Sequence, residues 1–160
     1  MVRKYWSFFL FLLVFSCAPA QAALSKGDWI GSGGIGTTVS PTLFLISPQI
    51  EYVYQRNLFV GPLIQAGMGQ GGALIGTSFT GRLHLGQHPR LRPFLEAGAG
   101  VMASNKLFTA SLGLLFHMGM GFDYLLEERL AISTVIRANF APPIQSFIFS
   151  WPMVVVRFIL

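Results

Sequence analysis

Residues 112–123 read LGLLFHMGMGFD, and this stretch decides the fold. Every even position from 112 to 122 holds a large apolar residue, whereas the odd positions are mostly small or polar and include His117 and Asp123. An α-helix has a period of 3.6 residues and would mix the two sets, while successive side chains of a β-strand point to opposite faces. The stretch therefore predicts a β-strand with one apolar face and one small or polar face.

Six further segments alternate in the same way, and a first strand near the N-terminus brings the number to eight. The predicted ranges are Trp29–Val39, Thr42–Tyr54, Leu58–Gly69, Leu74–Gly86, Leu91–Met102, Phe108–Tyr124, Leu130–Phe140 and Phe147–Leu160. Every charged residue inside a strand falls on its polar parity, although apolar residues share the parity of Arg157 in the last strand. Strands that are apolar toward lipid and polar toward a lumen are typical of transmembrane β-barrels. We therefore predict an all-β, eight-stranded antiparallel up-and-down transmembrane β-barrel with both termini periplasmic.

The composition supports a membrane protein. Hydrophobic residues make up 52% of the 160 residues and charged residues 11%, less than half of the roughly 25% found in soluble domains. The same figures exclude intrinsic disorder. Three uncharged stretches, 29–50, 57–81 and 138–156, are long enough for transmembrane helices. Their interruption by Gly, Pro, Gln and Ser, together with the two-residue period, favours strands instead.

The first 22 residues are expected to be a secretory signal peptide. Arg3 and Lys4 precede an apolar run at 5–15, and residues 20–22 (AQA) offer small side chains where a signal peptidase reads them. Cleavage after Ala22 would leave residues 23–160 as the outer-membrane β-barrel domain. The alternative is a lipoprotein signal with an acylated Cys17, the only cysteine of the sequence.

The connections between the predicted strands fall into two sets. Turns at 55–57, 86–90 and 125–129 are expected in the periplasm, and those near 40–41, 70–73, 103–107 and 141–145 are expected outside the cell. The outer loops are short, which leaves little material for a large receptor-binding surface.

The inward positions predict a network of charges in the lumen. Its members are Glu51, Arg82, His84, Arg92, Glu96, Asp123, Arg137 and Arg157. Because Arg82 and Glu96 fall almost opposite each other across one hairpin, we expect a salt-bridged plug in the periplasmic half. Small residues such as Gly76 and Gly113 line the outer half, which predicts a small vestibule open to the outside. The alternative is that the charges make the lumen polar without specific pairing.

The sequence offers no clear catalytic or metal site. Three separated histidines, His84, His88 and His117, give no metal-ligand spacing, and no cofactor is expected. His84 and His117 are expected to pack in the lumen, and His88 to lie in a solvated turn. His117 is expected opposite Arg137, a fixed cation that disfavours base catalysis where no carboxylate is close.

Two segments resemble a known family of bacterial barrels. Residues 92–100 (RPFLEAGAG) resemble a strand common in small outer-membrane barrels, and residues 119–131 (GMGFDYLLEERLA) resemble a strand–turn–strand late in the same proteins; residues 46–52 (ISPQIEY) match more weakly. The resemblance is to the OmpA/OmpX-like superfamily and covers most of the mature chain. It implies the eight-stranded barrel and says almost nothing about activity. The final residue, Leu160, departs from the aromatic residue that usually ends such barrels, which bears on assembly efficiency.

The same strand and hairpin are distantly similar to the PagL-like lipid A deacylases. That family carries an adjacent His and Ser on the strand after the hairpin, where residues 134–140 here read TVIRANF. A serine hydrolase needs a base within hydrogen-bond reach of its nucleophile, so we expect no enzymatic activity.

The expected function is that of an integral outer-membrane barrel with a structural, envelope or surface-interaction role. Expected partners are outer-membrane lipid, lipopolysaccharide and the barrel insertion machinery, which would read the C-terminal strand; we expect a monomer. The formal charge of +5 includes Arg3 and Lys4, and no basic cluster remains without them, so no nucleic-acid partner is expected. Two alternatives stay open: a lipid A deacylase-like hydrolase with a diverged site, and a passive conduit for small hydrophobic molecules.

Overall fold

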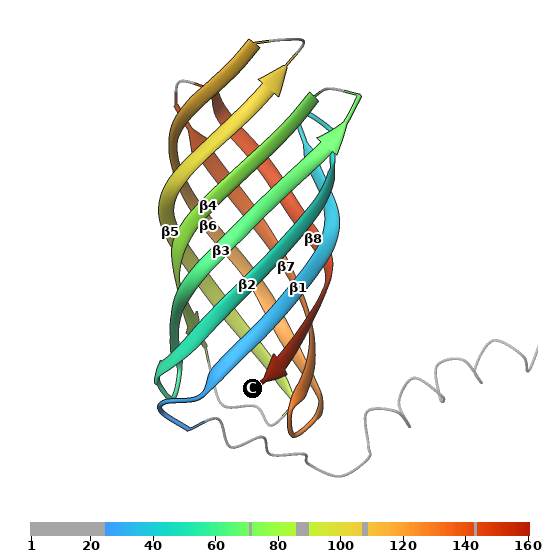
Figure 1. Ribbon diagram of the computed structural model, residues 1–160. Helices are drawn as coiled ribbons and strands as arrows, with labels where there is room; N and C mark the ends of the chain where they lie inside the picture. Colours follow the sequence, from blue (N-terminus) through green and yellow to red (C-terminus); the bar gives the residue numbers. More distant parts are fainter. Residues whose placement is uncertain (1–24, 71, 86–89, 107–108, 143) are drawn as a thin grey trace, which may run out of the picture.

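The protein forms a closed eight-stranded barrel (Figure 1). The computed structural model describes residues 25–70, 72–85, 90–106, 109–142 and 144–160. The strands are β1 (Trp29–Val39), β2 (Phe44–Gln55), β3 (Leu58–Gly69), β4 (Gly72–His84), β5 (Leu91–Lys106), β6 (Thr109–Glu127), β7 (Leu130–Ala141) and β8 (Gln145–Ile159). Each strand pairs antiparallel with the next, and β8 pairs with β1, which confirms the predicted fold class. Among the described residues, no helix has the length and apolarity needed to cross a membrane.

The start of β1 and the end of β8 lie at the same end of the barrel, which we call the basal end (Figure 1). The Leu160 amide there donates to the Trp29 carbonyl oxygen at 2.8 Å. The connections at 56–57, 85–90 and 128–129 also belong to the basal end, and the other four belong to the distal end. That the basal end faces the periplasm stays a prediction. The predicted signal peptide, with Cys17, and the turn residue His88 lie outside the described residues.

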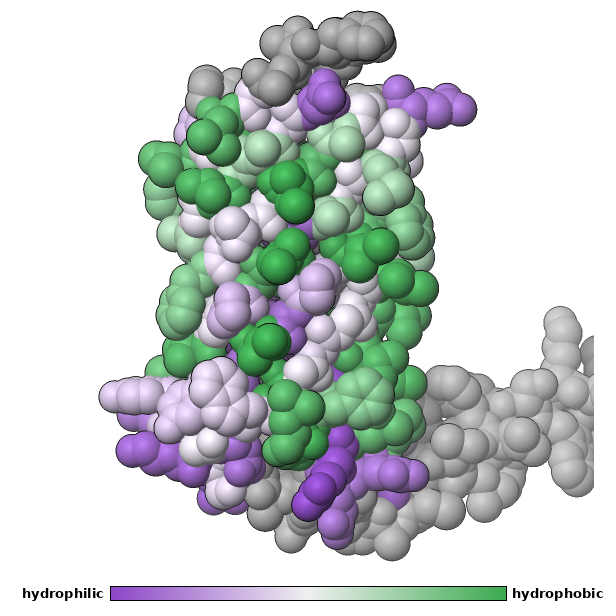
Figure 2. Space-filling model, viewed as in Figure 1, coloured by the Kyte–Doolittle hydropathy of each residue, from purple (hydrophilic) through white to green (hydrophobic). Residues whose placement is uncertain are grey.

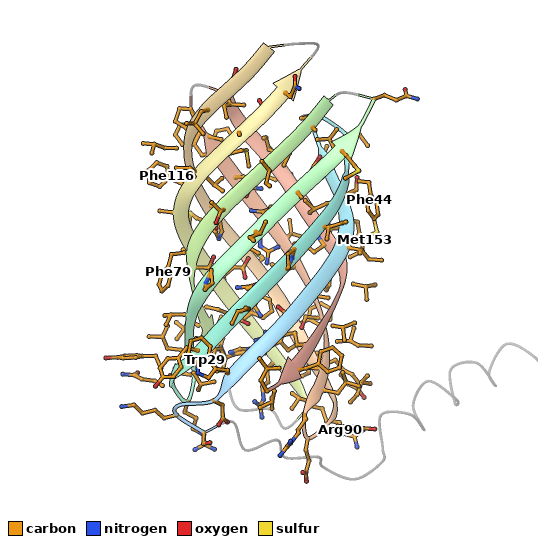
Figure 3. The ribbon with its side chains drawn as sticks, viewed as in Figure 1. Trp29, Phe44, Phe79, Arg90, Phe116 and Met153 are labelled. Carbon is orange, nitrogen blue, oxygen red and sulfur yellow. The ribbon has the colours of Figure 1, made fainter. Side chains whose placement is uncertain are left out.

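The outward face of the wall is apolar, as lipid requires. In Figure 3, Phe44, Phe79, Phe116 and Met153 point away from the strands, and all four are about half exposed or more. Hydrophobic residues cover much of the visible wall, and hydrophilic residues gather at the basal end (Figure 2). A predominantly apolar wall of this kind is the outer surface expected of a transmembrane barrel.

Side chains fill the inside of the barrel in layers. A basal apolar layer contains Ile30, Val53 and Phe59. A distal apolar layer contains Leu43, Leu74, Met102, Leu115, Ala141 and Ile148. Buried polar and charged residues occupy the space between them. An eight-stranded barrel is just wide enough for side chains to fill, which is why these layers can meet across the lumen.

The distal layer contradicts the predicted vestibule. Gly76 and Gly113 do line this part of the lumen, but large side chains from neighbouring strands occupy the space that the glycines leave. A Cβ atom on Gly76 would lie 3.1 Å from Leu115 and 3.2 Å from Met102. Leu115 has no exposed surface. Apolar side chains therefore fill the distal lumen where an open vestibule was expected.

A β-bulge explains the irregular last strand. The register of β8 against β1 shifts between Ile35 and Gly36, and Met153 is the extra residue. The buried positions of β8 are even before the bulge (148, 150 and 152) and odd after it (155 and 157). A bulge inserts one residue and so exchanges the faces of the residues that follow. This is why apolar residues share the parity of Arg157.

The pairing of β6 with β7 corrects one expectation. His117 lies opposite Asn139, and Arg137 lies opposite Gly119, so the predicted pairing of His117 with Arg137 is wrong by two residues. The cause is the turn: β6 continues to Glu127 and β7 begins at Leu130, which leaves a much shorter connection than the predicted 125–129. The centre of the turn therefore moves from residue 127 to between residues 128 and 129, which shifts every cross-strand pair along the hairpin.

Candidate functional site

Charged side chains from six strands meet in the basal half of the lumen. They are Glu51 (β2), Arg82 (β4), Glu96 (β5), Asp123 (β6), Arg137 (β7) and Arg157 (β8), and none is more than 5% exposed. Alternation places every second side chain inside, and the stagger of tilted strands brings these positions to one level. We call these six residues the lumen cluster.

Arg82 lies at the centre of the lumen cluster. Its Nη2 atom donates to Glu96 Oε2 at 3.0 Å and to Gln49 Oε1 at 3.2 Å. Its Nε atom lies 3.3 Å from Glu51 Oε1, and its Nη1 atom lies 3.9 Å from Asp123 Oδ1. The planar guanidinium carries five N–H donors, so one arginine can face three carboxylates at once.

Arg157 completes a ring of alternating charges. It donates to Glu51 Oε2 at 2.6 Å and to Asp123 Oδ2 at 2.5 Å. Arg82 contacts the same two carboxylates from the other side. Each charge in the ring therefore has two neighbours of opposite sign, the arrangement that offsets the cost of burying ions.

Glu96 connects this ring to a third arginine. Its Oε1 atom accepts a hydrogen bond from Arg137 Nε, and its Oε2 atom accepts from Arg82. Within the described part of the chain, Arg137 forms its ion pair with Glu96. Arg82 pairs with Glu96 and also with the carboxylates of Glu51 and Asp123. Arg137 thus depends on Glu96 more than Arg82 does.

His84 and Ser133 extend the cluster at Asp123. His84 Nε2 lies 2.8 Å from Asp123 Oδ2, and the Ser133 hydroxyl donates to Asp123 Oδ1 at 2.6 Å. The His84 ring packs edge-on against Phe59, with ring centroids 4.6 Å apart. Phe59 belongs to the basal apolar layer, so His84 marks the lower boundary of the charged region.

Arg92 lies at the edge of the charged region. It is half-buried, and it lines a small basal pocket of about 30 Å³ together with His84, Asp123 and Arg157. The structure therefore brings the predicted lumen residues together: seven of the eight are joined to one another by ion pairs or hydrogen bonds, and Arg92 lines the same pocket as three of these seven.

Sequence reasoning missed a second polar layer above the lumen cluster. Gln65 donates to Asn139 Oδ1 at 3.0 Å, Asn139 donates to Ser150 Oγ at 2.9 Å, and Ser150 donates back to Gln65 Oε1 at 2.9 Å. This triangle joins β3, β7 and β8 by uncharged groups. Gln65 and Asn139 are on the inward parity of their strands, but Ser150 has the opposite parity to Arg157 in the last predicted strand because the bulge exchanges its faces, and only the closed barrel brings β3 to β7 and β8.

Among the residues that the structure describes, the buried hydroxyl groups near His84 and His117 lack the arrangement that nucleophilic catalysis requires. Ser133 donates to Asp123, and His84 contacts the other oxygen of the same carboxylate, so the hydroxyl is not bonded to the imidazole. Thr80 Oγ1 does lie 3.3 Å from His117 Nε2, but both residues are at most 2% exposed and the described residues offer His117 Nδ1 no hydrogen-bond partner. Nucleophilic catalysis needs an oriented base and access for the substrate.

Acidic, histidine and cysteine side chains do not gather into a metal site in the described ranges. No group of three or more of them there has the arrangement to hold an ion. The three carboxylates of the lumen cluster are instead interleaved with guanidinium groups, which repel a cation.

Solved structures similar to this one include small outer-membrane barrels. Neisserial surface protein A is 10% identical, with a TM-score of 0.66 over 85% of this chain and 98% of that one. The N-terminal β-barrel domain of Pseudomonas aeruginosa OprF is 16% identical, with a TM-score of 0.65 over 85% and 98%. The outer-membrane enzyme PagL is 14% identical, with a TM-score of 0.49 over 81% and 98%, a likeness too weak to bear on activity.

These likenesses concern the fold alone, because a fold hosts many functions and identity is low. No protein-family model matches the sequence, and no curated protein matches it as a relative. The chain therefore has the fold of the small eight-stranded outer-membrane β-barrels, as the resemblance in its sequence implied.

Proposed function

We propose that this protein is a structural or envelope barrel of the bacterial outer membrane, without catalytic activity, whose lumen is closed by the lumen cluster. The observation that carries the proposal is the cross-linking of six strands by alternating charges. Arg82 and Arg157 each contact Glu51 and Asp123, and Glu96 joins Arg82 to Arg137. Contacts across the lumen brace opposite sides of the wall.

Charge balance supports a static role for the lumen cluster. It holds three guanidinium groups and three carboxylates, whose formal charges cancel, so the cluster offers no net charge to attract an ion. A permeating ion would have to displace paired charges, which is unfavourable because each would be left buried without its partner.

The apolar layers support closure at both ends. Leu74, Met102 and Leu115 pack together on the distal side of the cluster, and Val53 and Phe59 pack together on the basal side. A hydrated ion crossing the lumen would lose hydrogen bonds to water in either layer. The same layers argue against a passive conduit, because buried side chains occupy the space that a small hydrophobic molecule would use.

Conductance in planar lipid bilayers tests the proposal. The purified, folded protein should produce no stable single-channel steps in either direction of applied voltage. Steady steps that scale with protein concentration and survive repurification would contradict a closed lumen.

Lipid A composition tests the absence of catalysis. Mass spectra of lipid A from a strain that lacks the protein should match those of the parent strain. A difference of one acyl chain, restored by the native gene, would instead assign a hydrolase activity. Altered uptake of hydrophobic compounds with unchanged lipid A would favour the conduit.

A further inference from the structure

Aromatic side chains mark the basal edge of the outward wall on β1 and β2. Outward positions of β2 are apolar up to Ile50 and change to Tyr52 and Tyr54 at the basal end of the strand. Trp29 begins β1 and lies opposite Tyr52 in the ladder, with ring centroids 5.2 Å apart. Figure 3 shows Trp29 toward the basal end of the barrel. Tryptophan and tyrosine favour the boundary between hydrocarbon and water, so we expect this edge at the level of lipid headgroups.

A lysine lies against this aromatic edge. The Lys26 Nζ atom is 5.9 Å from the centroid of the Tyr54 ring, within the range of a cation–π contact. Two backbone hydrogen bonds hold the segment that carries this lysine on β2. The Gly27 amide donates to the Val53 carbonyl oxygen at 3.0 Å, and the Val53 amide donates to the Asp28 carbonyl oxygen at 2.9 Å. The backbone as well as the ring therefore keeps the lysine beside the wall.

The neighbouring carboxylate does not neutralise Lys26. Asp28 instead accepts hydrogen bonds from Ser25, at 2.8 Å from its amide and at 3.1 Å from its hydroxyl. Within the part of the chain that the structure describes, Lys26 forms no ion pair with a carboxylate. Because its side chain is exposed, its positive charge is available to a group outside the chain.

Four hydrogen-bond donors meet at this edge. They are the Lys26 ammonium group, the Trp29 indole N–H and the hydroxyls of Tyr52 and Tyr54. The two tyrosines are neighbours on the outward face of β2, and each contacts one of the other two residues. No described residue accepts a hydrogen bond from any of these donors. We call these four residues the basal corner, a surface that suits a singly charged anion with several acceptor oxygens.

We propose that the basal corner binds the phosphodiester group of a membrane glycerophospholipid. A phosphodiester carries one negative charge, which one ammonium group balances, and its oxygens accept hydrogen bonds from charged and neutral donors. The acyl chains of the lipid lie along the apolar outward face distal to the corner, where Ile50 is exposed. The proposal goes beyond the closed lumen and rests only on the location of the barrel in a membrane.

Two other occupants fit the basal corner less well. Lipid A carries two phosphate groups, whereas the corner offers one lysine, and the basal end is the end predicted to face the periplasmic leaflet. Two upright copies of the chain that met here about a two-fold axis would bring both Lys26 ammonium groups together, which costs energy through like-charge repulsion. The occupant we infer is therefore the glycerophospholipid.

Native mass spectrometry of the folded protein in detergent tests the site, with phosphatidylglycerol as the titrated probe. Lys26→Gln should weaken retention about fivefold, the contribution of one lysine close to an anionic lipid. Lys26→Arg keeps the charge and should retain the lipid as the native protein does. The matched control is Arg129→Gln, which removes an exposed cation from the connection between β6 and β7 at the same end and should leave retention unchanged.

A second variant and two further lipids keep the test decisive. Tyr54→Leu removes the ring beside Lys26 and should weaken phosphatidylglycerol about two- to fivefold, so it replaces Lys26→Gln if that variant does not fold, as judged by migration on unboiled gels. Lys26→Gln should not change retention of diacylglycerol with the same chains, because that lipid lacks the phosphate. It should also leave retention of lipid A unchanged.

Four outcomes would overturn the proposal. The first is native-like retention of phosphatidylglycerol by folded Lys26→Gln or, should that variant fail to fold, by Tyr54→Leu. The second is an equal loss in Arg129→Gln, which would mean that retention follows the total charge of the basal end. The third is an equal loss of diacylglycerol or a greater loss of lipid A, which would assign the corner to another lipid chemistry. The fourth is a native dimer that Lys26→Gln converts to a monomer, which would assign it to a second copy.

Discussion

Replacing Glu96 by alanine should destabilise the barrel strongly. Glu96 is 4% exposed, and its two oxygens accept hydrogen bonds from Arg82 and Arg137. Without the carboxylate, Arg82 keeps Glu51 and Asp123 as partners, whereas Arg137 is left as a buried cation without its recorded ion pair. The main cost is therefore the stranded Arg137 guanidinium.

The expected size follows from that stranded charge. Breaking a buried ion pair by removing one partner costs roughly 3–5 kcal/mol. With a urea dependence of roughly 1–3 kcal/mol per molar, Glu96→Ala should lower the urea midpoint by about 1 M or more. Glu127→Ala is the matched control, because Glu127 is an exposed carboxylate at the end of β6, where substitutions stay within about 0.5 kcal/mol.

The assay is urea unfolding of the native protein and both variants in lipid vesicles, followed by tryptophan fluorescence. Arg137→Met added to Glu96→Ala removes the stranded charge and should recover about 1–3 kcal/mol of the loss. Equal midpoints for Glu96→Ala and Glu127→Ala would refute the paired lumen cluster. A double variant no more stable than Glu96→Ala would refute the stranded cation as the cause.

Three further outcomes are expected from the fold and its packing. The folded protein should give a β-rich far-ultraviolet spectrum and migrate differently on gels before and after boiling, because a closed barrel has no free edge from which to unfold; a helical spectrum would contradict the fold. Gly98→Ala should cost about 1–3 kcal/mol in the same urea assay, because its Cβ atom would lie 2.6 Å from the Phe79 carbonyl oxygen. Gly33→Ala should be neutral, because a Cβ atom there would meet nothing within 4 Å. Leu115→Ala should cost about 2–5 kcal/mol, because Leu115 is fully buried, and Leu112→Ala should cost far less, because Leu112 is 71% exposed on the outside. Similar urea midpoints for the two leucine variants would mean that the distal lumen is not packed.

The strands could be predicted from the sequence because alternation is a local property. The bounds of β1 and β3 agree with the predicted ranges, and their faces follow from parity alone. Strand ends are less local: β5 continues to Lys106, beyond the predicted end at Met102, because pairing with β6 carries it further. The extent of a strand depends on its partner as well as on its own residues.

Some contacts of the candidate site could also be predicted from local register, and others could not. Arg82 lies opposite Glu96 in a hairpin, so their neighbourhood follows from local register. The contacts of Arg157 with Glu51 and Asp123 join β8 to β2 and β6, which are not its neighbours in the sheet. Such contacts require closure of the barrel and the stagger of its strands, which alternation does not encode.

The filled distal lumen shows why parity also misleads. The glycines of the inward face suggested open space, but Leu74 and Leu115 occupy the same face. Volume in a lumen is shared between strands, so a glycine on one strand accommodates a large residue on another. Only the register that joins them shows which residue fills which gap.

The seam between β7 and β8 is irregular, because the bulge of β8 interrupts the ladder there. The register jumps from Ser133 opposite Val155 to Arg137 opposite Ser150. At this break the Thr134 hydroxyl accepts from Trp151 Nε1 at 3.1 Å and donates to the Pro152 carbonyl oxygen at 3.4 Å.

Water cannot replace these hydrogen bonds on a face that meets hydrocarbon. Thr134→Val should therefore cost about 1–2 kcal/mol and speed amide exchange at Trp151, Met153 and Val154, while Thr77→Val, on the outward face of β4, should do neither. If the two valine variants exchange alike, the Thr134 hydroxyl does not stabilise the seam, and the backbone pairing on either side of the bulge is sufficient to keep β7 and β8 together.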